Sequence, residues 1–461
     1  MYKEFMAEYE SLNHMTERKE SRLEQKAYHI PHHGILRESS TTTRLRVVFN
    51  ASAPTSSGVS LNNIQMVGPT VQDDLLSILL RFRQHKYIIS GDVEKMYRQI
   101  VIHPDDRYLQ RILWRDDPSK PLKIFELNTV TYGTASAPFL ATRCIKQLGL
   151  ECEDEVVREV IIHDFYVDDL LTGGDDLQQV LSIKSKVTST LADAGMNLRK
   201  WKSNEPQLML DSDSSQLDLN IGTEPSKTLG LSWQPGSDEL CFPVGQCSLI
   251  GDTKRDLLSI VAQIFDPTGV LAPCVILMKM LLQTLWRQKL SWDQKLTPEI
   301  SKLWEDIAHD LPCLNDIRIP RLVLCESYEE VECHIFTDAS ERAYGACLYL
   351  RSINGKGDVL VRLLLAKSRV APIKPTTIPR LELSGALAGV RLYEKKTLGP
   401  WGQGAHSVYK ELAKRLIDAT GDRKAGAYLA QRIGVAVQRG NAASLLGTLP
   451  EGTDLGPVFY L

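Results

Sequence analysis

Residues 157–172 read VREVIIHDFYVDDLLT, so two adjacent carboxylates, Asp168 and Asp169, stand between two apolar runs. This pattern predicts a β-hairpin with the two acids at its tip. Taken alone, the pair also fits an ordinary turn, because Asp is common in turns. A carboxylate beside buried strands is costly, however, unless a cation compensates its charge. The rest of the sequence has to decide between these two interpretations.

A third carboxylate, Asp92, ends another apolar run, YIISGD (87–92). Mg²⁺ prefers carboxylate oxygens, keeps several waters and binds substrate phosphates. Two such ions close together activate an attacking hydroxyl and stabilise a leaving oxygen. Asp92, Asp168 and Asp169 are therefore candidate ligands for two Mg²⁺ ions, with Mn²⁺ as an alternative.

The composition limits the class of protein only broadly. The chain has 461 residues, a net charge of −3 and 43% hydrophobic residues, as ordinary globular proteins have. No apolar run is long enough to span a membrane, and the N-terminus lacks the apolar core of a secretory signal. The nine cysteines are scattered, which favours free thiols in a reducing compartment. The net charge gives no support to a nucleic-acid partner.

The hydrophobic pattern predicts both strand-like and helix-like segments along the chain. Residues 1–26 are expected to form a charged helix or a disordered lead, and 51–70 a loop. Strands are predicted at 28–50, 85–93, 122–131, 227–243 and 331–350. Helices are predicted at 71–84, 139–149, 175–195, 252–312 and 380–396, with breaks at Pro267 and Pro273.

Further motifs accompany the carboxylates in a fixed order: TYGTASAPF (131–139), LRKWKSN (198–204) and TLGLSW (228–233). Together with GDVEKMYRQI around Asp92 and YVDD at 166–169, they resemble the ordered motifs of reverse transcriptases. The segment YHIPHHGILRESSTTTRLRVVFNASAPTSSGVSLNNIQMVGPT (28–70) is similar to the fingers of the BEL/Pao group of long-terminal-repeat retrotransposons. The resemblance covers about residues 20–393.

This resemblance implies an α+β fold, a right-hand polymerase with fingers, a ferredoxin-like palm and a helical thumb. An incomplete ribonuclease H-like α/β domain is expected to follow. The expected division is a charged N-terminal lead (1–27), fingers and palm (28–250), a helical thumb or connection (251–325), a partial ribonuclease H-like domain (326–396) and an unassigned basic helical tail (397–461). The tail is either a binding helix for RNA or a partner, or the product of a fused exon or wrong gene model.

The resemblance also implies roles around the three carboxylates. The backbone carbonyl of Val93 is expected to face a metal ion. Tyr97 occupies the position of an aromatic steric gate, whose ring would exclude a nucleotide 2′-hydroxyl. An ordinary core aromatic is the alternative for Tyr97. Lys200, or alternatively Lys202, corresponds to a lysine near the leaving pyrophosphate, although a solvated charge fits the sequence equally well.

Arg37 and Arg44 match basic positions of the fingers that bind the triphosphate, for which guanidinium groups are suited. Gly133 and Pro138 are expected to shape the nucleotide pocket. Tyr132 departs from the family, because many relatives carry Gln there, and this leaves the details of the base-pair pocket open.

FTDAS (336–340) and PRLEL (379–383) resemble the first strand and first helix of ribonuclease H domains. Asp338 and Glu382 would be two of the four carboxylates of such a domain, but the later acidic motifs are missing. We therefore expect RNA-strand cleavage to be absent or very weak. His29, His32 and His33 lack further ligands at zinc spacing and are assigned to a fingers turn.

The leading hypothesis from the sequence is an RNA-directed DNA polymerase. Its expected partners are a primed RNA or DNA template, deoxynucleoside triphosphates and other parts of a retrotransposon polyprotein, with no membrane. A cytoplasmic virus-like particle or nucleoprotein is the expected location, with the nucleus as an alternative. The second hypothesis is a decayed or host-retained fragment that binds RNA or a protein without catalysis. The third is a nuclease built on Asp338 and Glu382.

Overall fold

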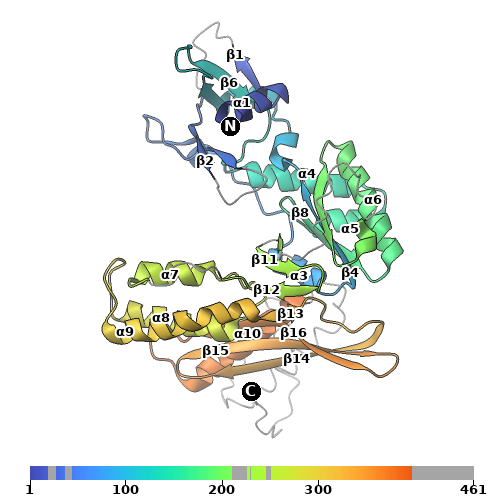
Figure 1. The fold of residues 1–461 in the computed structure, drawn as a ribbon, viewed down its shortest axis with the longest axis vertical. Coiled ribbons are helices and arrows are strands. Elements are labelled where there is room, and N and C mark those ends of the chain that lie inside the picture. The colour runs from blue at the N-terminus through green and yellow to red at the C-terminus, as the bar shows by residue number, and fades with distance from the viewer. Residues whose placement is uncertain (19–26, 37–43, 210–225, 229, 245–250, 397–461) are drawn as a thin grey trace, which may run out of the picture. The chain divides into compact units, whose positions relative to one another are not determined.

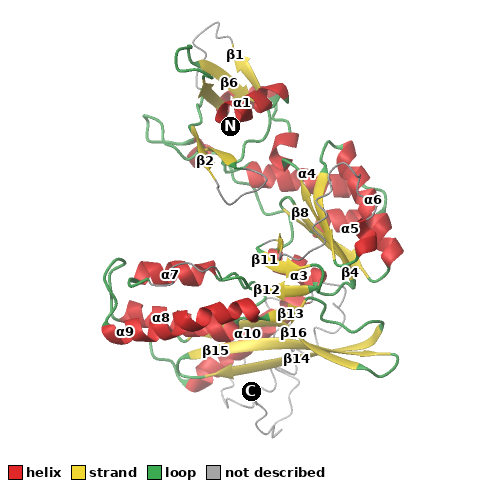
Figure 2. Ribbon diagram, viewed as in Figure 1, coloured by secondary structure: helices red, strands yellow, loops and turns green. Residues whose placement is uncertain are grey.

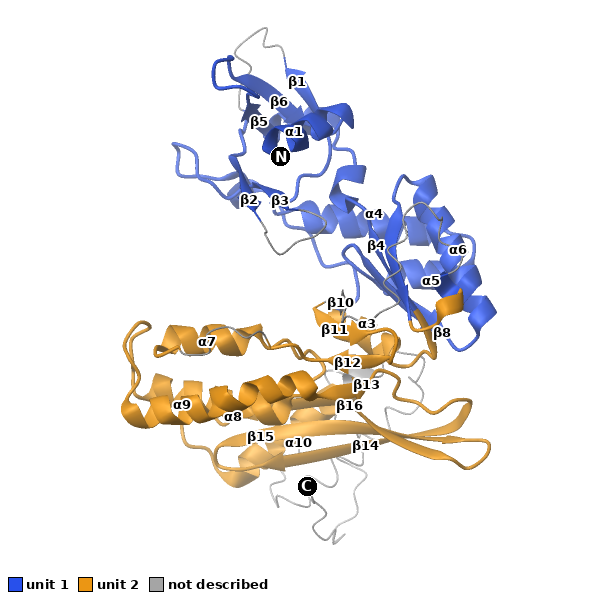
Figure 3. Ribbon diagram, viewed as in Figure 1, with its two compact units in different colours: residues 1–74, 89–203, 208–211 blue, residues 75–88, 204–207, 212–461 orange. Residues whose placement is uncertain are grey.

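The computed structural model describes residues 1–18, 27–36, 44–209, 226–228, 230–244 and 251–396 (Figure 1). Arg37 and the tail from 397 lie outside the described residues. Among the described residues, no helix is long and apolar enough to cross a membrane. The chain divides into two compact units, one of residues 1–74, 89–203 and 208–211 and the other of the remainder (Figure 3).

The first unit contains a four-stranded sheet in the order β7-β8-β4-β9. Helices α4, α5 and α6 pack their apolar residues against it in one core (Figure 2). The strands are β4 (Tyr87–Val93), β7 (Phe165–Tyr166), β8 (Asp169–Gly174) and β9 (Leu198–Ser203). The helices are α4 (Ala137–Glu151), α5 (Glu155–His163) and α6 (Leu177–Asp193). This sheet with its helices corresponds to the expected palm.

One part of the predicted hairpin is wrong. Residues 157–163 belong to helix α5 rather than to a strand, and only Phe165 and Tyr166 form β7. The side chain of Asp154 caps the helix by accepting the Val157 N–H at 3.1 Å. Val157, Val160 and Ile161 recur at helical spacing and are buried against the sheet. The hairpin itself therefore spans only the residues around Asp168.

The N-terminal residues are an integral part of the first unit. Helix α1 (Tyr2–Ser11) buries Met6 and Tyr9, and strand β1 (Met15–Arg18) pairs with β6. Their core also receives side chains from the remaining strands and the short helix of this region. These are β2 (His32–Leu36), β3 (Leu45–Phe49), α2 (Leu61–Ile64), β5 (Arg111–Trp114) and β6 (Lys123–Leu127). The expected helix is thus confirmed for Tyr2–Ser11 alone, since Met15–Arg18 form a strand and 19–26 lie outside the described residues. The proposed domain boundary at 27 remains a prediction.

The second unit begins with helix α3 (Leu75–Phe82) and includes a small antiparallel sheet, β10-β11-β12-β13. Its strands are β10 (Ser226–Thr228), β11 (Leu231–Gln234), β12 (Glu239–Cys241) and β13 (Arg318–Pro320). Helices α7 (Lys254–Gln263), α8 (Ala272–Arg287) and α9 (Pro298–Asp310) share one apolar core. Pro273 lies in the first turn of α8, so it begins that helix.

The last part of the second unit is a three-stranded antiparallel sheet of β14 (Tyr328–Ala339), β15 (Ala343–Asn354) and β16 (Val359–Val370). Helix α10 (Ile378–Lys396) packs on β14 and β15 and shares their core (Figure 1). Gly385 and Gly389 allow this contact. A Cβ atom at Gly385 would lie 3.2 Å from the Asp338 carbonyl oxygen, and one at Gly389 2.9 Å from Ile335 Cγ2.

Candidate active site

The tip of the β7–β8 hairpin carries Asp168 and Asp169. Tyr166 pairs with Asp169, so Val167 and Asp168 form the turn. Val167 has a positive φ of 56°, an uncommon backbone conformation for a β-branched residue. The Asp168 carbonyl oxygen accepts the Val93 N–H at 2.8 Å, which ties the turn to β4. The fold thus brings both acids beside the strand that carries Asp92.

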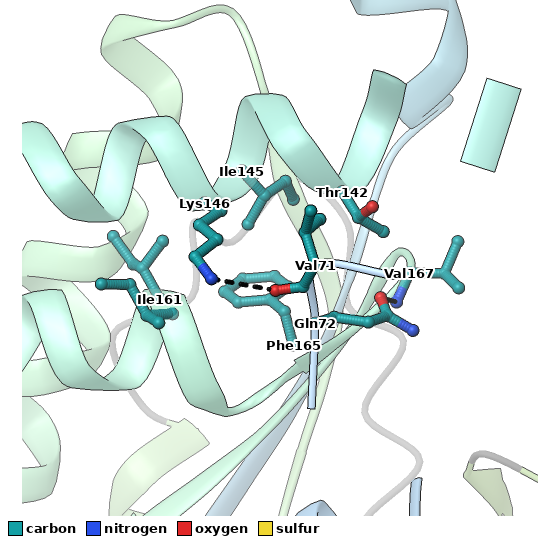
Figure 4. A pocket seen from close by; sticks show the side chains of 9 residues that line it. Val71, Gln72, Thr142, Ile145, Lys146, Ile161, Phe165 and Val167 are labelled. Atoms are coloured by element: carbon teal, nitrogen blue, oxygen red, sulfur yellow. Dashed lines mark hydrogen bonds between the residues drawn. The ribbon is translucent and has the colours of Figure 1, made fainter. Parts of the chain in front are cut away.

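Gln72 supports this turn from another segment of the first unit. Its side-chain oxygen accepts the Val167 N–H at 2.9 Å (Figure 4). Close by, Lys146 of α4 donates to the Val71 carbonyl at 3.2 Å. The cavity beneath, lined also by Ile145, Ile161 and Phe165, has a volume of only about 10 Å³. It has room for about one water, so the hairpin rests on a closely packed base.

Asp92 lies on β4, opposite Arg199 of β9. The Lys200 ammonium is 3.4 Å from its carboxylate, and the Lys200 backbone has a positive φ of 53°. Lys202, two residues further along β9, is half-buried. Burial lowers the pKa of Lys202, while the Asp169 carboxylate opposes that shift. Two cationic side chains therefore accompany the three carboxylates.

The charges of neighbouring carboxylates contribute to raised pKa values of Asp168 and Asp169. Burial, then the charges of Asp168 and Asp92, raise the pKa of Asp169 to about 6. Burial and the Asp92 charge also raise the pKa of Asp168. Both shifts have the sign expected for acids that are partly removed from water and crowded by like charge. Lys200 and Lys202 reduce the shift of Asp169 without reversing it.

This charge distribution fits a divalent cation, because an added positive charge would relieve the repulsion. Among the described residues, no three His, Cys, Asp or Glu side chains are already gathered as a closed metal cluster. The fit therefore rests on the donor type and the charge, with hard carboxylate oxygens that suit Mg²⁺.

Tyr97 lies in a short 3₁₀ helix, η1 (Met96–Gln99), directly after β4. Its ring packs against the palm core. Burial raises the pKa of the Tyr97 hydroxyl, and the negative charge of Asp168 adds to the shift. The ring is therefore both a core aromatic and a neighbour of the carboxylates. Lys95, which precedes the helix, has a positive φ of 52°.

Gly133 lies where the chain passes against β3. Its φ is +101°, and a Cβ atom would be only 2.1 Å from the Phe49 carbonyl oxygen. Asn62 of α2 holds the same loop by donating to the Gly133 carbonyl at 3.0 Å and accepting the Ala135 N–H at 2.8 Å. Pro138 is exposed in the first turn of α4. The prediction of a loop over 51–70 is therefore wrong at Leu61–Ile64, which form the short helix α2.

The other expected residues lie near strands β2 and β3 of the first unit or in the second unit. Arg44 is exposed just before β3. His32 and His33 lie in strand β2 rather than in a turn, and His32 contacts the Tyr2 hydroxyl and the Leu113 carbonyl. In the second unit, Glu382 of α10 feels the charge of Asp338 at the end of β14. Burial first, and then Asp338, raise the pKa of Glu382.

Sequence reasoning missed Gln72 and Asn62. Gln72 holds a backbone group that is remote in sequence through one hydrogen bond, and Asn62 holds two such groups. A lone Gln or Asn carries no signal of such contacts. The SLNN pattern (60–63) does contain a local signal, because Ser60 and Asn63 form a reciprocal cap at the start of α2.

Comparison with known proteins finds two family models that match parts of this chain. A family model described as reverse transcriptase (RNA-dependent DNA polymerase) matches residues 35–231, a range that includes Asp92, Asp168 and Asp169. A second model, described as Pao retrotransposon-like RNaseH-like domain, matches residues 253–398. The two matches together identify a reverse transcriptase and ribonuclease H-like segment of a Pao-type retrotransposon. This confirms the resemblance found from the motifs.

Two solved structures show a similar fold. Both are of a foamy viral protease-reverse transcriptase, one in complex with double-stranded DNA and one with an RNA/DNA hybrid. The TM-scores are 0.55 and 0.53, each at 16% sequence identity. The aligned regions cover 85% and 86% of this chain but only 59% and 46% of those chains. They confirm the expected fold class, a reverse transcriptase domain followed by a ribonuclease H-like domain. No curated protein matches the chain.

Proposed function

We propose that this chain is an RNA-directed DNA polymerase that adds deoxynucleotides to a primer 3′-hydroxyl. The observation that carries the proposal is the convergence of Asp92, Asp168 and Asp169 at one end of the palm sheet. Each of the two hairpin acids feels the charge of Asp92. The match of the surrounding residues to a reverse transcriptase model supports it.

Asp92, Asp168 and Asp169, with the Val93 carbonyl, would hold two Mg²⁺ ions. When bound, these ions lower the pKa of the attacking hydroxyl and neutralise charge on the transferring phosphoryl group. The protein itself contributes positioning. The Val93 N–H and the Gln72 side chain fix the hairpin turn that presents the carboxylates. Fixed geometry of this kind removes an entropic part of the barrier.

Other residues are proposed to hold the nucleotide. Tyr97 would lie against the sugar and exclude a 2′-hydroxyl. Arg44 and Arg37 would bind the triphosphate, and Lys200 would stabilise charge on the leaving pyrophosphate, because a protonated lysine is a compact cation. Gly133 and Pro138 would shape the pocket beside the base pair.

The proposed partners are a primed RNA or DNA template, deoxynucleoside triphosphates and other retrotransposon polypeptides. In the similar structures, the foamy viral protein is in complex with double-stranded DNA or with an RNA/DNA hybrid. For this chain, we propose action in a cytoplasmic virus-like particle or nucleoprotein, with a nuclear step as the alternative. We also propose the domain limits that the motifs imply, with fingers and palm at 28–250, thumb or connection at 251–325 and the ribonuclease H-like part at 326–396.

Dependence on metal and nucleotide separates this proposal from the two other hypotheses. A polymerase needs both Mg²⁺ and deoxynucleotides to change a labelled primer. A binding fragment retains the primed template with neither, and a nuclease built on Asp338 and Glu382 shortens RNA with metal alone. Primer elongation only when both are present supports the polymerase. Template binding without elongation at any metal concentration would contradict it.

A further inference from the structure

Helix α1 contacts one residue before Tyr97 and one residue after it in the sequence. The carboxylate of Glu8 accepts a hydrogen bond from the Lys95 ammonium at 2.6 Å and from the Arg98 guanidinium at 3.2 Å. Lys95 is the residue before η1, and Arg98 follows Tyr97 within it. One side chain of α1 is thus paired to cations that flank Tyr97 in sequence.

Arg98 is held firmly in this arrangement. Its side chain is 8% exposed, so its position is set by protein contacts. Its Nε donates to His14 Nδ1 at 2.9 Å, and its guanidinium lies 4.1 Å from the centre of the Tyr9 ring. Charge-assisted hydrogen bonds and a cation–π contact at a buried site are strong for their kind. Three side chains of the N-terminal segment therefore fix one residue of η1.

Lys95 is more exposed than Arg98 and has an uncommon backbone conformation. Its backbone is in the left-handed region, with a φ of 52°, and its side chain is 38% exposed. A residue without a glycine's freedom keeps such a conformation only where its surroundings hold it. The Glu8–Lys95 pair is a contact that does so. Without it, the entry to η1 would lose one restraint, while Arg98 would still be anchored by His14 and Tyr9.

We propose that Glu8 is a positioning residue for the nucleotide sugar, holding η1 so that the Tyr97 ring stands at a fixed place beside Asp168. This inference rests on the proposed polymerase function. It gives the N-terminal segment a role in the choice between deoxyribonucleotides and ribonucleotides, although Glu8 is 89 residues before Tyr97 in the chain.

The test compares Glu8→Gln with Glu10→Gln. Glu10 is an exposed acid of the same helix, and its charge acts on Lys123 instead. Single-nucleotide incorporation gives kcat/KM for a deoxynucleotide and for the matching ribonucleotide. We expect Glu8→Gln to reduce the preference for the deoxynucleotide by about fivefold to tenfold, mainly through KM, because the hydrogen bonds from Lys95 and Arg98 lose their anionic acceptor. Glu10→Gln should behave as the wild type.

A double variant strengthens the test. If Glu8 acts through Lys95, then Glu8→Gln combined with Lys95→Met should change discrimination no more than either substitution alone. Fully additive effects would contradict the proposed coupling. Equal discrimination by the wild type and Glu8→Gln would overturn the role in sugar selection.

Hydrogen exchange provides a readout that needs no catalysis. Amides of residues 94–100 should exchange faster in Glu8→Gln than in the wild type or Glu10→Gln, at unchanged overall stability. Unchanged exchange there would overturn the positioning role, even in a protein that does not extend primers. Absence of extension by the wild type would instead count against the proposed polymerase function, so the two failures are distinguishable.

Discussion

At the scale of single residues, the site depends on groups placed where a different side chain would not fit. Gly133 is the clearest example, because both its backbone conformation and the nearby Phe49 carbonyl exclude a Cβ atom. Asp168 and Asp169 are placed under a different restriction, since both are partly buried near like charge. Sequence motifs can point to such residues because the restriction is local and severe.

Gly133→Ala should destabilise the protein and reduce primer extension. The positive φ alone costs roughly 1–3 kcal/mol, and the collision with Phe49 adds to it. Gly58→Ala is the matched control, because Gly58 also has a positive φ, +79°, but has open space around its Cβ position. Urea unfolding of both variants isolates the effect of the collision. Equal losses of stability would show that Phe49 moves away freely.

His14 predicts a pH dependence of stability. Burial, then the charges of Arg98 and Lys95, lower its pKa to about 4 in the folded protein. The unfolded chain therefore binds more protons between pH 6.5 and 4, so stability should fall as the pH decreases through this window. The expected loss is on the order of 2 kcal/mol. In His14→Gln, chemical denaturation at pH 7 and pH 4.5 should show a smaller difference, and an unchanged difference would contradict the assignment.

At the scale of elements, the sequence was sufficient to predict most helices and strands, but not the contacts that hold them together. The run at 157–163 is apolar enough for a strand, yet its helical spacing and the Asp154 cap make it α5. The contacts that support the site join distant segments. Gln72 and Val167 are 95 residues apart, and Glu8 and Lys95 are 87 apart. No local pattern encodes such pairs, because they arise only when the elements pack.

Gln72 should matter for catalysis more than for binding. Gln72→Leu leaves the Val167 N–H without its acceptor and loosens the turn that presents Asp168. We expect kcat to fall about tenfold or more, in line with 1–3 kcal/mol for an unsatisfied polar group, with little change in affinity for the primed template. Thr142→Ala, in the wall of the same cavity, is the control. A similar effect of both substitutions would indicate general loosening of the palm.

At the scale of the whole molecule, the segment combines a reverse transcriptase domain with a ribonuclease H-like domain, as the two family matches show. Among the described residues, Asp338 and Glu382 are the two proposed to represent the expected ribonuclease H acids. The charge of Asp338 adds to the rise that burial causes in the pKa of Glu382, so the fold brings the two acids near each other. Two carboxylates provide fewer ligands for a pair of metal ions than the four expected of that family.

Cleavage of the RNA strand of an RNA–DNA hybrid should therefore be absent or very weak. A gel assay with Mg²⁺ and a labelled hybrid tests this, with Asp338→Asn as the matched variant. Both proteins should leave the RNA intact. Efficient cleavage by the wild type that Asp338→Asn abolishes would restore the nuclease hypothesis for this part of the chain.

Primer extension on an RNA template with Mg²⁺ and deoxynucleotides, comparing the chain with Asp168→Asn, tests the central claim most directly. The substitution keeps the size of the side chain and the turn but removes one charge. We expect the chain to extend the primer and the variant to be slower by roughly 10³-fold, equivalent to several kcal/mol of lost transition-state stabilisation. Equal extension by both proteins would contradict the role of the carboxylates, and template binding without extension by either would favour a fragment that binds nucleic acid without catalysis.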